Sequence, residues 1–273
     1  MTHDLSSRPP YENPYEQVRI GSNTVVKLHR FAVGNPEVAR FVPTLSPPSA
    51  KLETYFRLLD VPYEVVPVMG VQDAPRGKVP YIAVGDVKLT DSDLIIGYLK
   101  RTQVNPDANL TPTQWATGHL VQRTLEDHLY WIIVYYEFCD QAGWDFLLCA
   151  SVGDPSALPA TIRAGFDAGR ADFMRRCWDH GIARYTPAEI IEKASKDLRA
   201  VAEIIGDHQY LLGTDRPTSF DAVAVGMMLA LYQARDMHHE ITDFARSIPN
   251  LSRYMHRMVT AHYPDLEPAF QPA

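Results

Sequence analysis

The 273-residue chain has few cysteines. Its three, Cys139, Cys149 and Cys177, show no C-x-x-C or other metal-like spacing. An odd and sparse set argues against a disulfide scaffold and fits a reducing compartment, so we expect a cytoplasmic protein. The simplest expectation for each thiol is a small buried hydrophobic side chain.

The sequence also lacks a basic run, a long apolar run and a metal motif. Its formal net charge is -7 and no run of five or more basic residues occurs, which argues against a nucleic-acid partner. The longest uncharged apolar stretch, 222–234, is well short of the roughly 20 residues that span a bilayer. The N-terminus has no apolar signal region. The ten histidines show no H-E-x-x-H spacing, so we expect no metal.

Length and composition indicate two domains. A chain of 273 residues is long for one core, and 46% hydrophobic with 22% charged residues is ordinary globular composition. We predict a polar, Pro- and Asn-rich arm, mobile or extended, over 1–23. A first domain over 24–102, a linker over 103–112 and an all-helical domain over 113–273 follow.

The first domain has the pattern of an α/β fold. Alternating apolar residues predict a strand over 25–31, and Ser46-Pro47 opens a helix with apolar residues at i, i+3, i+4 and i+7. A strand over 63–68, two strands around a Gly85-Asp86 turn and a helix from 92 complete the order βαβ then ββα. This order is thioredoxin-like, with Pro80 where that fold places a cis-proline.

The second half shows helical periodicity throughout. Apolar stripes over 121–136 and 190–205 predict two long helices, and further helices are expected from Pro217 and near 249–259. Thr218-x-x-Asp221 fits a capping box, in which Asp221 reaches back to the amide that begins the helix. We assign Asp221 a folding role and leave it out of the candidate site.

The segment 78–99 is similar to a known family. It joins Val79-Pro80, before a short apolar run, to Asp91-Ser92 at a helix start eleven residues later. This pattern resembles the glutathione-binding half of the first domain of glutathione S-transferases. The resemblance implies that Val79, with Pro80 and Lys78, bonds the cysteinyl backbone of glutathione. A trans-proline that begins an edge strand is the alternative.

The same resemblance assigns the γ-glutamyl group. Ser92 would hold its carboxylate at the positive end of a helix, and Asp91 would hold its ammonium. Plain helix capping is the alternative, because Asp and Ser are both favoured caps.

Ser46 is the candidate group for activating sulfur. It lies at the start of the first helix, at the position of the family's catalytic Ser or Cys, where its hydroxyl and the helix dipole would stabilise a thiolate. Ser49 in the same turn is the second candidate. The alternative is again a helix cap. Because neither position is a cysteine, disulfide-exchange chemistry lacks its nucleophile at this helix.

The branch is indicated by further residues. The stretch 45–57, with its K-L-E-T run from Lys51 to Thr54, looks like the failed-axon-connections and metaxin-like branch, whose members often show S-P-x-C-x-K-L-E-T. Ser49 departs from that pattern. The likeness spans about residues 24–265.

The resemblance implies a Ser-type glutathione transferase for detoxification of a small, apolar electrophile, and a homodimer. A non-catalytic assembly protein is the main alternative, and a glutathione-dependent isomerase, dehalogenase or ether-cleaving enzyme is another. Four aromatic residues are candidates for the co-substrate pocket: Tyr130, Trp131, Tyr135 and Phe41.

Overall fold

The structure is a computed structural model that describes residues 14–16, 18–21 and 23–272. The first half contains strands β1 (Val26–Phe31), β2 (Tyr63–Val68), β3 (Tyr81–Val84) and β4 (Val87–Thr90), and helices α1 (Pro36–Ala39), α2 (Pro47–Leu58) and α3 (Ser92–Thr102). The second half contains α4 (Pro112–Arg123), a π-helical segment (Thr124–Leu129), α5 (Tyr130–Phe138), α6 (Gln141–Val152), α7 (Ala160–His180), α8 (Pro187–Ile205), α9 (Ser219–Gln233), α10 (His239–Arg246) and α11 (Pro249–His262).

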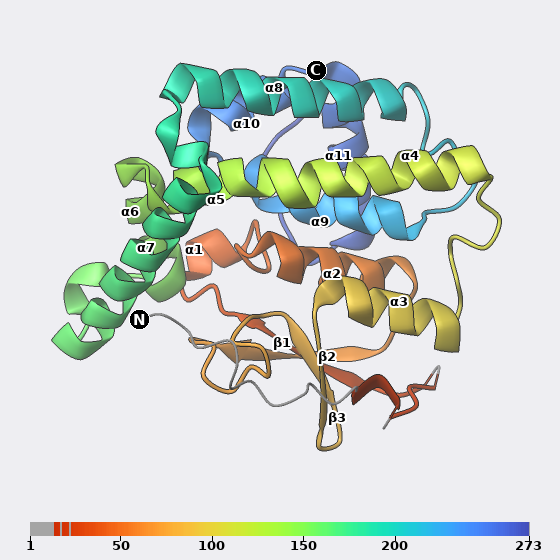
Figure 1. Ribbon diagram of the computed structural model, residues 1–273, viewed down its shortest axis with the longest axis horizontal. Coiled ribbons are helices and arrows are strands. Elements are labelled where there is room, and N and C mark those ends of the chain that lie inside the picture. Colours follow the sequence, from red (N-terminus) through yellow and green to blue (C-terminus); the bar gives the residue numbers. More distant parts are fainter. Residues whose placement is uncertain (1–13, 17, 22, 273) are drawn as a thin grey trace.

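The four strands form one mixed sheet in the order β2-β1-β3-β4. β1 and β2 are parallel and are joined through α2, whereas β3 is antiparallel to β1 and forms a hairpin with β4. The thioredoxin-like arrangement predicted from the sequence is therefore confirmed. Helices α2 and α3 lie between the sheet and the helical half (Figure 1).

The described part of the N-terminal segment packs on the first domain. Ile20 is 2% exposed, and its N–H donates to the Tyr98 hydroxyl, which itself donates to the carbonyl of Val18. The Tyr15 hydroxyl donates to the carbonyl of Thr90 at 2.7 Å. This part of the predicted arm is thus anchored on the first domain, and it contains a short 3-10 helix, Pro14–Glu16. Residues 1–13, 17 and 22 of the arm lie outside the described residues.

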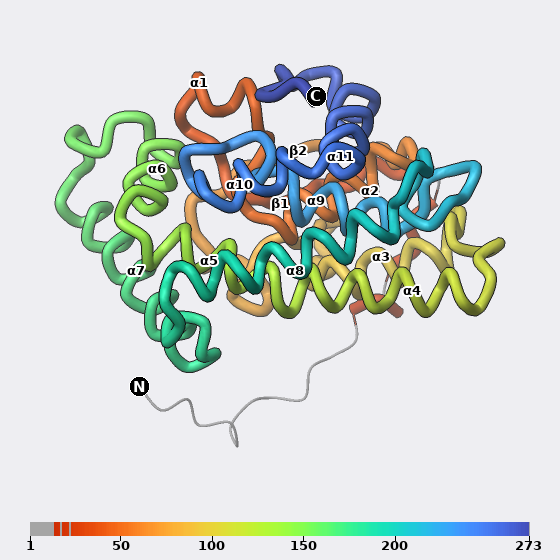
Figure 2. The backbone as a smooth tube through the Cα atoms, turned by 90° about the horizontal axis from the view of Figure 1, so that it is seen from above, coloured from red at the N-terminus to blue at the C-terminus, as the bar shows by residue number. Residues whose placement is uncertain are grey.

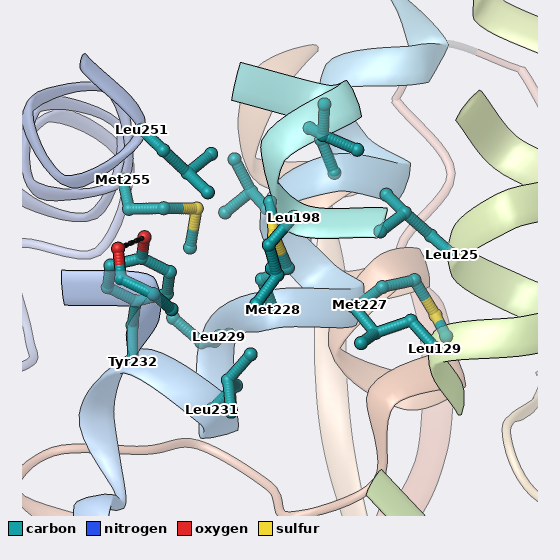
Figure 3. Close-up of a cluster of buried hydrophobic side chains, with 14 of the residues drawn as sticks. Leu125, Leu129, Leu198, Met227, Met228, Leu229, Leu231, Tyr232, Leu251 and Met255 are labelled. Atoms are coloured by element: carbon teal, nitrogen blue, oxygen red, sulfur yellow. Dashed lines mark hydrogen bonds between the residues drawn. The ribbon is translucent and has the colours of Figure 1, made fainter. Parts of the chain in front are cut away.

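The helical half surrounds α9, whose fifteen residues are all buried. In Figure 3, Leu198 of α8, Met228 of α9 and Met255 of α11 point into one cluster of apolar side chains. The predicted reach-back of Asp221 is confirmed, because its Oδ2 accepts from the N–H of Thr218 at 2.8 Å. The core of this half and the start of its central helix are therefore fixed together.

The two halves meet where α2 crosses α9. A Cβ at Gly226 of α9 would lie 2.2 Å from the Cα of Lys51 and 2.3 Å from its nitrogen, so glycine is what permits the close approach. The linker also joins the halves, since Asp107 accepts from the N–H and the hydroxyl of Ser219 at 2.8 and 2.6 Å. The linker thereby caps α9.

Three features differ from the sequence expectations. The loop after β1 contains the short helix α1, the long stripe over 121–136 is interrupted by the π-helical segment, and α6 and α7 form a hairpin at one end of the molecule (Figure 2). The hairpin contacts the loop after β1, because the N–H of Asn35 donates to the carbonyl of Ala150 at 3.0 Å.

Candidate functional site

The sheet register brings the predicted binding segments to one end of the first domain. His29 of β1 pairs with Tyr81 of β3, and Tyr81 pairs with Thr90 of β4. The end of β1, the peptide before β3 and the start of α3 therefore lie side by side. The loop that leaves β1 at this end leads to Ser46 and α2.

The peptide bond between Val79 and Pro80 is cis, as predicted from the sequence. Within the described residues, the N–H and the C=O of Val79 have no hydrogen-bond partner, and the residue is half-buried. Lys78 is exposed. A strand-like donor and acceptor are thus open to an extended ligand at this end of the sheet.

Asp91 begins α3 in a backbone conformation that is rare outside glycine, with φ 77°. Its Oδ1 accepts from the N–H groups of Asp93 and Leu94 at 3.0 and 3.1 Å. This oxygen therefore caps α3, which was the alternative to a binding role. Oδ2 of Asp91 has no partner within the described residues, nor do the N–H and hydroxyl of the half-buried Ser92. Capping therefore leaves anion- and cation-binding groups available.

Ser46 occupies the N-cap position of α2, but its side chain makes no capping hydrogen bond. Its Oγ instead accepts from the hydroxyl of Ser49, which is fully buried, at 3.1 Å. The Ser46 N–H donates to Oγ1 of Thr44 at 3.3 Å. Because Ser49 supplies the proton between the two hydroxyls, the proton of Ser46 remains free for another acceptor.

The loop before Ser46 is held by a half-buried arginine that the sequence reasoning missed. Arg30 of β1 donates to the carbonyl of Pro43, and its Nε lies 2.8 Å from Oε2 of Glu53 on α2. Glu53 is 1% exposed and also accepts from the hydroxyl of Tyr63 at 3.0 Å. The only sequence sign of this clamp is Glu53 itself, within the K-L-E-T run.

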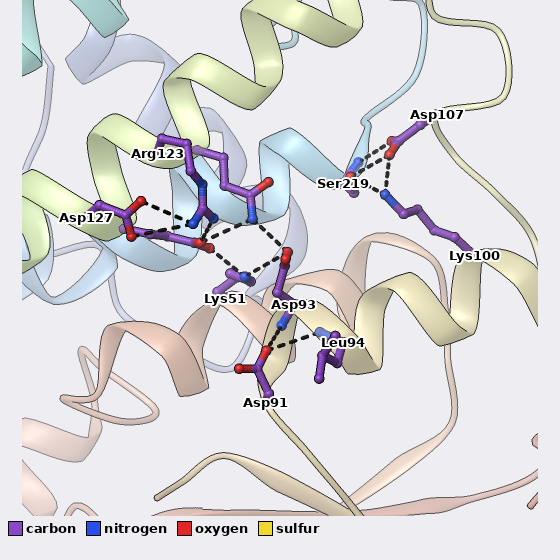
Figure 4. Close-up of polar contacts among 11 residues, drawn as sticks. Lys51, Asp91, Asp93, Leu94, Lys100, Asp107, Arg123, Asp127 and Ser219 are labelled. Atoms are coloured by element: carbon purple, nitrogen blue, oxygen red, sulfur yellow. Dashed lines mark hydrogen bonds and ion pairs between the residues drawn. The ribbon is translucent and has the colours of Figure 1, made fainter. Parts of the chain in front are cut away.

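A second cation, which is buried, links the helices near the site (Figure 4). Nζ of Lys51 on α2, whose side chain is 2% exposed, lies 2.5 Å from Glu126 and 3.7 Å from Asp93 on α3. Gln122 donates to Asp93 at 2.7 Å. Burial opposes ionisation of Asp93, but Lys51 and Gln122 hold its pKa below the ordinary value. The first turns of α2 and α3 are thus tied together, with Ser46 roughly 7.5 Å before Lys51 along α2.

The aromatic candidates are divided between two places. Tyr130, Trp131 and Tyr135 lie on α5 and pack against the helical core, and the Trp131 ring stacks on His180 at 4.7 Å. Phe41 lies near the end of α9, where its carbonyl accepts from Gln233 at 3.0 Å. No ring contact joins Phe41 to the other three within the described residues, and their role in a co-substrate pocket stays a prediction.

The described residues contain neither a candidate metal cluster nor a helix suited to a membrane. Among residues 14–16, 18–21 and 23–272, no three His, Cys, Asp or Glu side chains are grouped so that they could hold a metal ion. No helix in the described part of the chain has the length and apolar character needed to cross a membrane.

Comparison with known proteins decides the family. Residues 47–143 match the model of the glutathione S-transferase N-terminal domain, and 194–258 match that of the C-terminal domain. The chain is 30% identical over 225 residues to an isoprene-epoxide glutathione S-transferase from Rhodococcus sp., covering 80% of this chain and 92% of that protein. The chain belongs to the glutathione S-transferase superfamily.

Within this superfamily, the relatives place the chain in the failed-axon-connections and metaxin-like branch. It is 30% identical over 236 residues to Failed axon connections of Drosophila melanogaster, covering 82% of this chain and 56% of that protein, and 20% identical to human Metaxin-2. The chain thus spans little more than half of the Drosophila protein.

Solved glutathione S-transferases share the fold. One from Methylobacterium radiotolerans, in complex with glutathione sulfonate, matches with a TM-score of 0.55 at 15% identity over 92% of this chain and 98% of that one. Rice GST1 in complex with glutathione gives a TM-score of 0.53 at 14% identity over 90% of this chain and 91% of that one.

Proposed function

We propose that this protein is a glutathione transferase that activates the glutathione thiol with Ser46 for attack on a small electrophile. The observation that carries the proposal is the state of the Ser46 hydroxyl. Ser46 stands at the start of α2, but its side chain makes no capping hydrogen bond. Its hydroxyl oxygen accepts from Ser49, and its own proton is left to donate.

The open polar groups suit the cysteinyl and γ-glutamyl residues of the tripeptide. The main chain of Val79 would pair with the cysteinyl residue. The N–H and hydroxyl of Ser92, at the positive end of α3, would bind the γ-glutamyl carboxylate. Oδ2 of Asp91 would accept from the γ-glutamyl ammonium, and Pro80 and the exposed Lys78 border the same end of the sheet.

The reaction needs a thiolate near neutral pH, whereas an unperturbed thiol has a pKa of about 8.5. A hydroxyl donor and the N-terminus of α2 both favour the charged sulfur, so the proton leaves to water and the thiolate is retained. The sulfur then attacks a carbon of the electrophile, such as an epoxide. The carbon–oxygen bond breaks, and the oxygen takes a proton from water.

The epoxide is the first co-substrate to test, because a relative that is 30% identical is named as an isoprene-epoxide transferase. We place the apolar co-substrate near Tyr130, Trp131 and Tyr135 of α5, or near Phe41. The same thiolate would also serve isomerisation, dehalogenation or ether cleavage, so product analysis by mass spectrometry distinguishes these reactions from conjugation.

Ser46→Ala tests the proposal. Calorimetry should give a Kd for glutathione within a few-fold of the wild-type value. In contrast, kcat/KM with a small epoxide should fall about 10- to 100-fold, which corresponds to the loss of one hydrogen bond to a charged group. The apparent pKa of the bound thiol should rise. Ser195→Ala on α8 is the matched control and should leave both unchanged. Absence of binding at millimolar glutathione, or full activity in Ser46→Ala, would refute the proposal.

A non-catalytic binding or assembly role is the second candidate, favoured by the 30% identity to Failed axon connections. It predicts glutathione binding without turnover, and biological activity that Ser46→Ala leaves intact. We further propose a cytoplasmic homodimer with a role in detoxification, by analogy with soluble transferases. Light scattering and cell fractionation test the assembly and the location.

A further inference from the structure

The segment after α11 runs back to the loop between β1 and α2. Asp265 accepts from Arg57 of α2 at 2.5 Å, and two residues later the N–H of Glu267 donates to the carbonyl of Arg40 at 2.7 Å. The carboxylate of Glu267 also accepts from Nε and Nη2 of Arg40 at 2.9 and 2.8 Å. Figure 2 shows this segment beside the loop that carries α1. Residues 264–272 thus form a C-terminal strap across this loop.

Gln233 joins the C-terminal strap to the loop. It is the last residue of α9 and is 4% exposed, and its Nε2 donates to the carbonyls of Phe41 and Glu267, both at 3.0 Å. Its Oε1 accepts from the N–H of Ala269, also at 3.0 Å. One buried amide therefore bonds one main-chain group of the loop and two of the strap. Loss of the strap would leave Oε1 and one N–H of this amide without their partners, which is costly in a buried place.

An aromatic contact holds the far end of the C-terminal strap. Phe270 is 8% exposed, and its ring lies 5.1 Å from that of Tyr232 on α9 and 5.7 Å from that of His256 on α11. The guanidinium of Arg246 on α10 lies 5.1 Å from the same ring. Phe270 thus anchors the strap on three helices of the second half. A substitution there loosens the strap without altering a residue of the loop.

The loop has a separate anchor nearer to Ser46. Arg30 of β1 donates to the carbonyl of Pro43, and Oγ1 of the fully buried Thr44 accepts from the N–H of Ser46 at 3.3 Å. The C-terminal strap is bonded earlier in the loop, next to α1 and at Phe41. Loosening the strap therefore frees α1 and Phe41, whereas the anchor at Pro43 keeps Ser46 in place.

We propose that the C-terminal strap, with Gln233 as a positioning residue, fixes α1 and Phe41 and thereby sets which apolar electrophiles the site accepts. The inference rests on the proposed transferase function, because it assigns the co-substrate to the side of Ser46 that this loop forms. Four partly buried apolar side chains of the loop and of α6 pack on one cluster there: Val33, Val38, Phe146 and Leu147. A loosened loop loses the fit to a small electrophile, while the thiolate keeps its donor.

Hydrogen exchange followed by mass spectrometry tests the strap without any need for turnover. In Gln233→Leu and in Phe270→Ala, main-chain amides over 36–42 should exchange about 10-fold faster than in wild type, the effect of losing one or two hydrogen bonds. Amides over 43–50 should keep their wild-type rates. Arg235→Gln, in an exposed ion pair two residues after Gln233, is the matched control and should change neither segment. Wild-type exchange over 36–42 in both strap variants would overturn the proposal.

Kinetics separate the strap from the chemistry. With a small epoxide, KM should rise about 10-fold in both strap variants, which corresponds to one apolar contact in a pocket, whereas kcat and the Kd for glutathione should change less than about twofold. The preference for a small over a bulky epoxide should shrink. A fall in kcat at unchanged KM would place the effect at Ser46 and overturn the assigned role. A wild type without turnover would refute the transferase function, while faster exchange over 36–42 would still support the strap.

Discussion

The crossing of α2 over α9 depends on the absence of a side chain at Gly226. In Gly226→Ala, the new Cβ would meet the Cα of Lys51 at 2.2 Å and the carbonyl carbon of Ala50 at 2.7 Å. These are backbone atoms, so no rotation of a side chain relieves the overlap. The helices must separate by at least 1.2 Å before Lys51 reaches the 3.4 Å of an ordinary contact.

The separation costs packing over the whole junction. Overpacked core positions typically lose about 1 to 3 kcal/mol, and the backbone clash puts Gly226→Ala at the upper end. Alanine in place of glycine returns up to about 1 kcal/mol of helix propensity. We therefore expect a net loss of about 2 kcal/mol in the free energy of unfolding. The ion pair of Lys51 with Glu126 should weaken as well, because α2 carries Lys51 away.

Urea denaturation followed by circular dichroism measures this loss. The matched control is Gly165→Ala on the exposed helix α7, where a Cβ would meet nothing within 4 Å, and which should gain up to about 1 kcal/mol. If Gly226→Ala is as stable as wild type while Gly165→Ala behaves as expected, glycine does not set the helix approach. The proposed transferase activity should fall with stability, since Ser46 is the N-cap of α2.

Three further predictions follow from buried polar groups. Lys51→Met removes the buried cation from Oε1 of Glu126, while Arg123 and Gln122 still bond Oε2, so it should cost about 1 to 3 kcal/mol. Lys51→Met/Glu126→Gln should recover part of this loss in a double-mutant cycle of urea denaturation. The two carboxylate oxygens of Asp221 accept four hydrogen bonds, and Asp221→Asn replaces one of these acceptors with an NH2 donor. Thermal unfolding should therefore show a loss of about 3 kcal/mol in the free energy of unfolding, and a loss below about 1 kcal/mol would contradict this. Burial and two nearby lysines lower the pKa of His29 from 6.5, so the unfolded chain binds more protons and stability should fall as pH drops below 6.5. His29→Phe, which keeps a ring against Tyr81, should flatten this dependence in urea titrations at pH 7.5 and 5.5, and an unchanged slope would exclude His29 as a cause.

The sequence predicted the elements whose pattern is local. Alternation identified β1, the Ser46-Pro47 pair identified the start of α2, and Val79-Pro80 identified a peptide that is cis in the structure. The sequence could not predict the partners of Lys51 and Glu53, because charged residues in helices are usually exposed to solvent and only the tertiary packing shows that these two are buried. The π-helical segment was missed for a similar reason, since its apolar residues keep helical spacing.

The K-L-E-T run, the part of the chain most typical of its branch, serves assembly more than chemistry. Lys51 ties α2 to Glu126, Glu53 holds Arg30, and the hydroxyl of Thr54 meets that of Tyr263 at 2.7 Å. These contacts hold the junction in this chain whether or not it transfers glutathione. The run is therefore evidence for the family and is neutral on catalysis. What bears on the proposed catalysis is the pair of hydroxyls at Ser46 and Ser49, because the Ser46 oxygen accepts from Ser49 and the Ser46 proton is left to donate to a ligand.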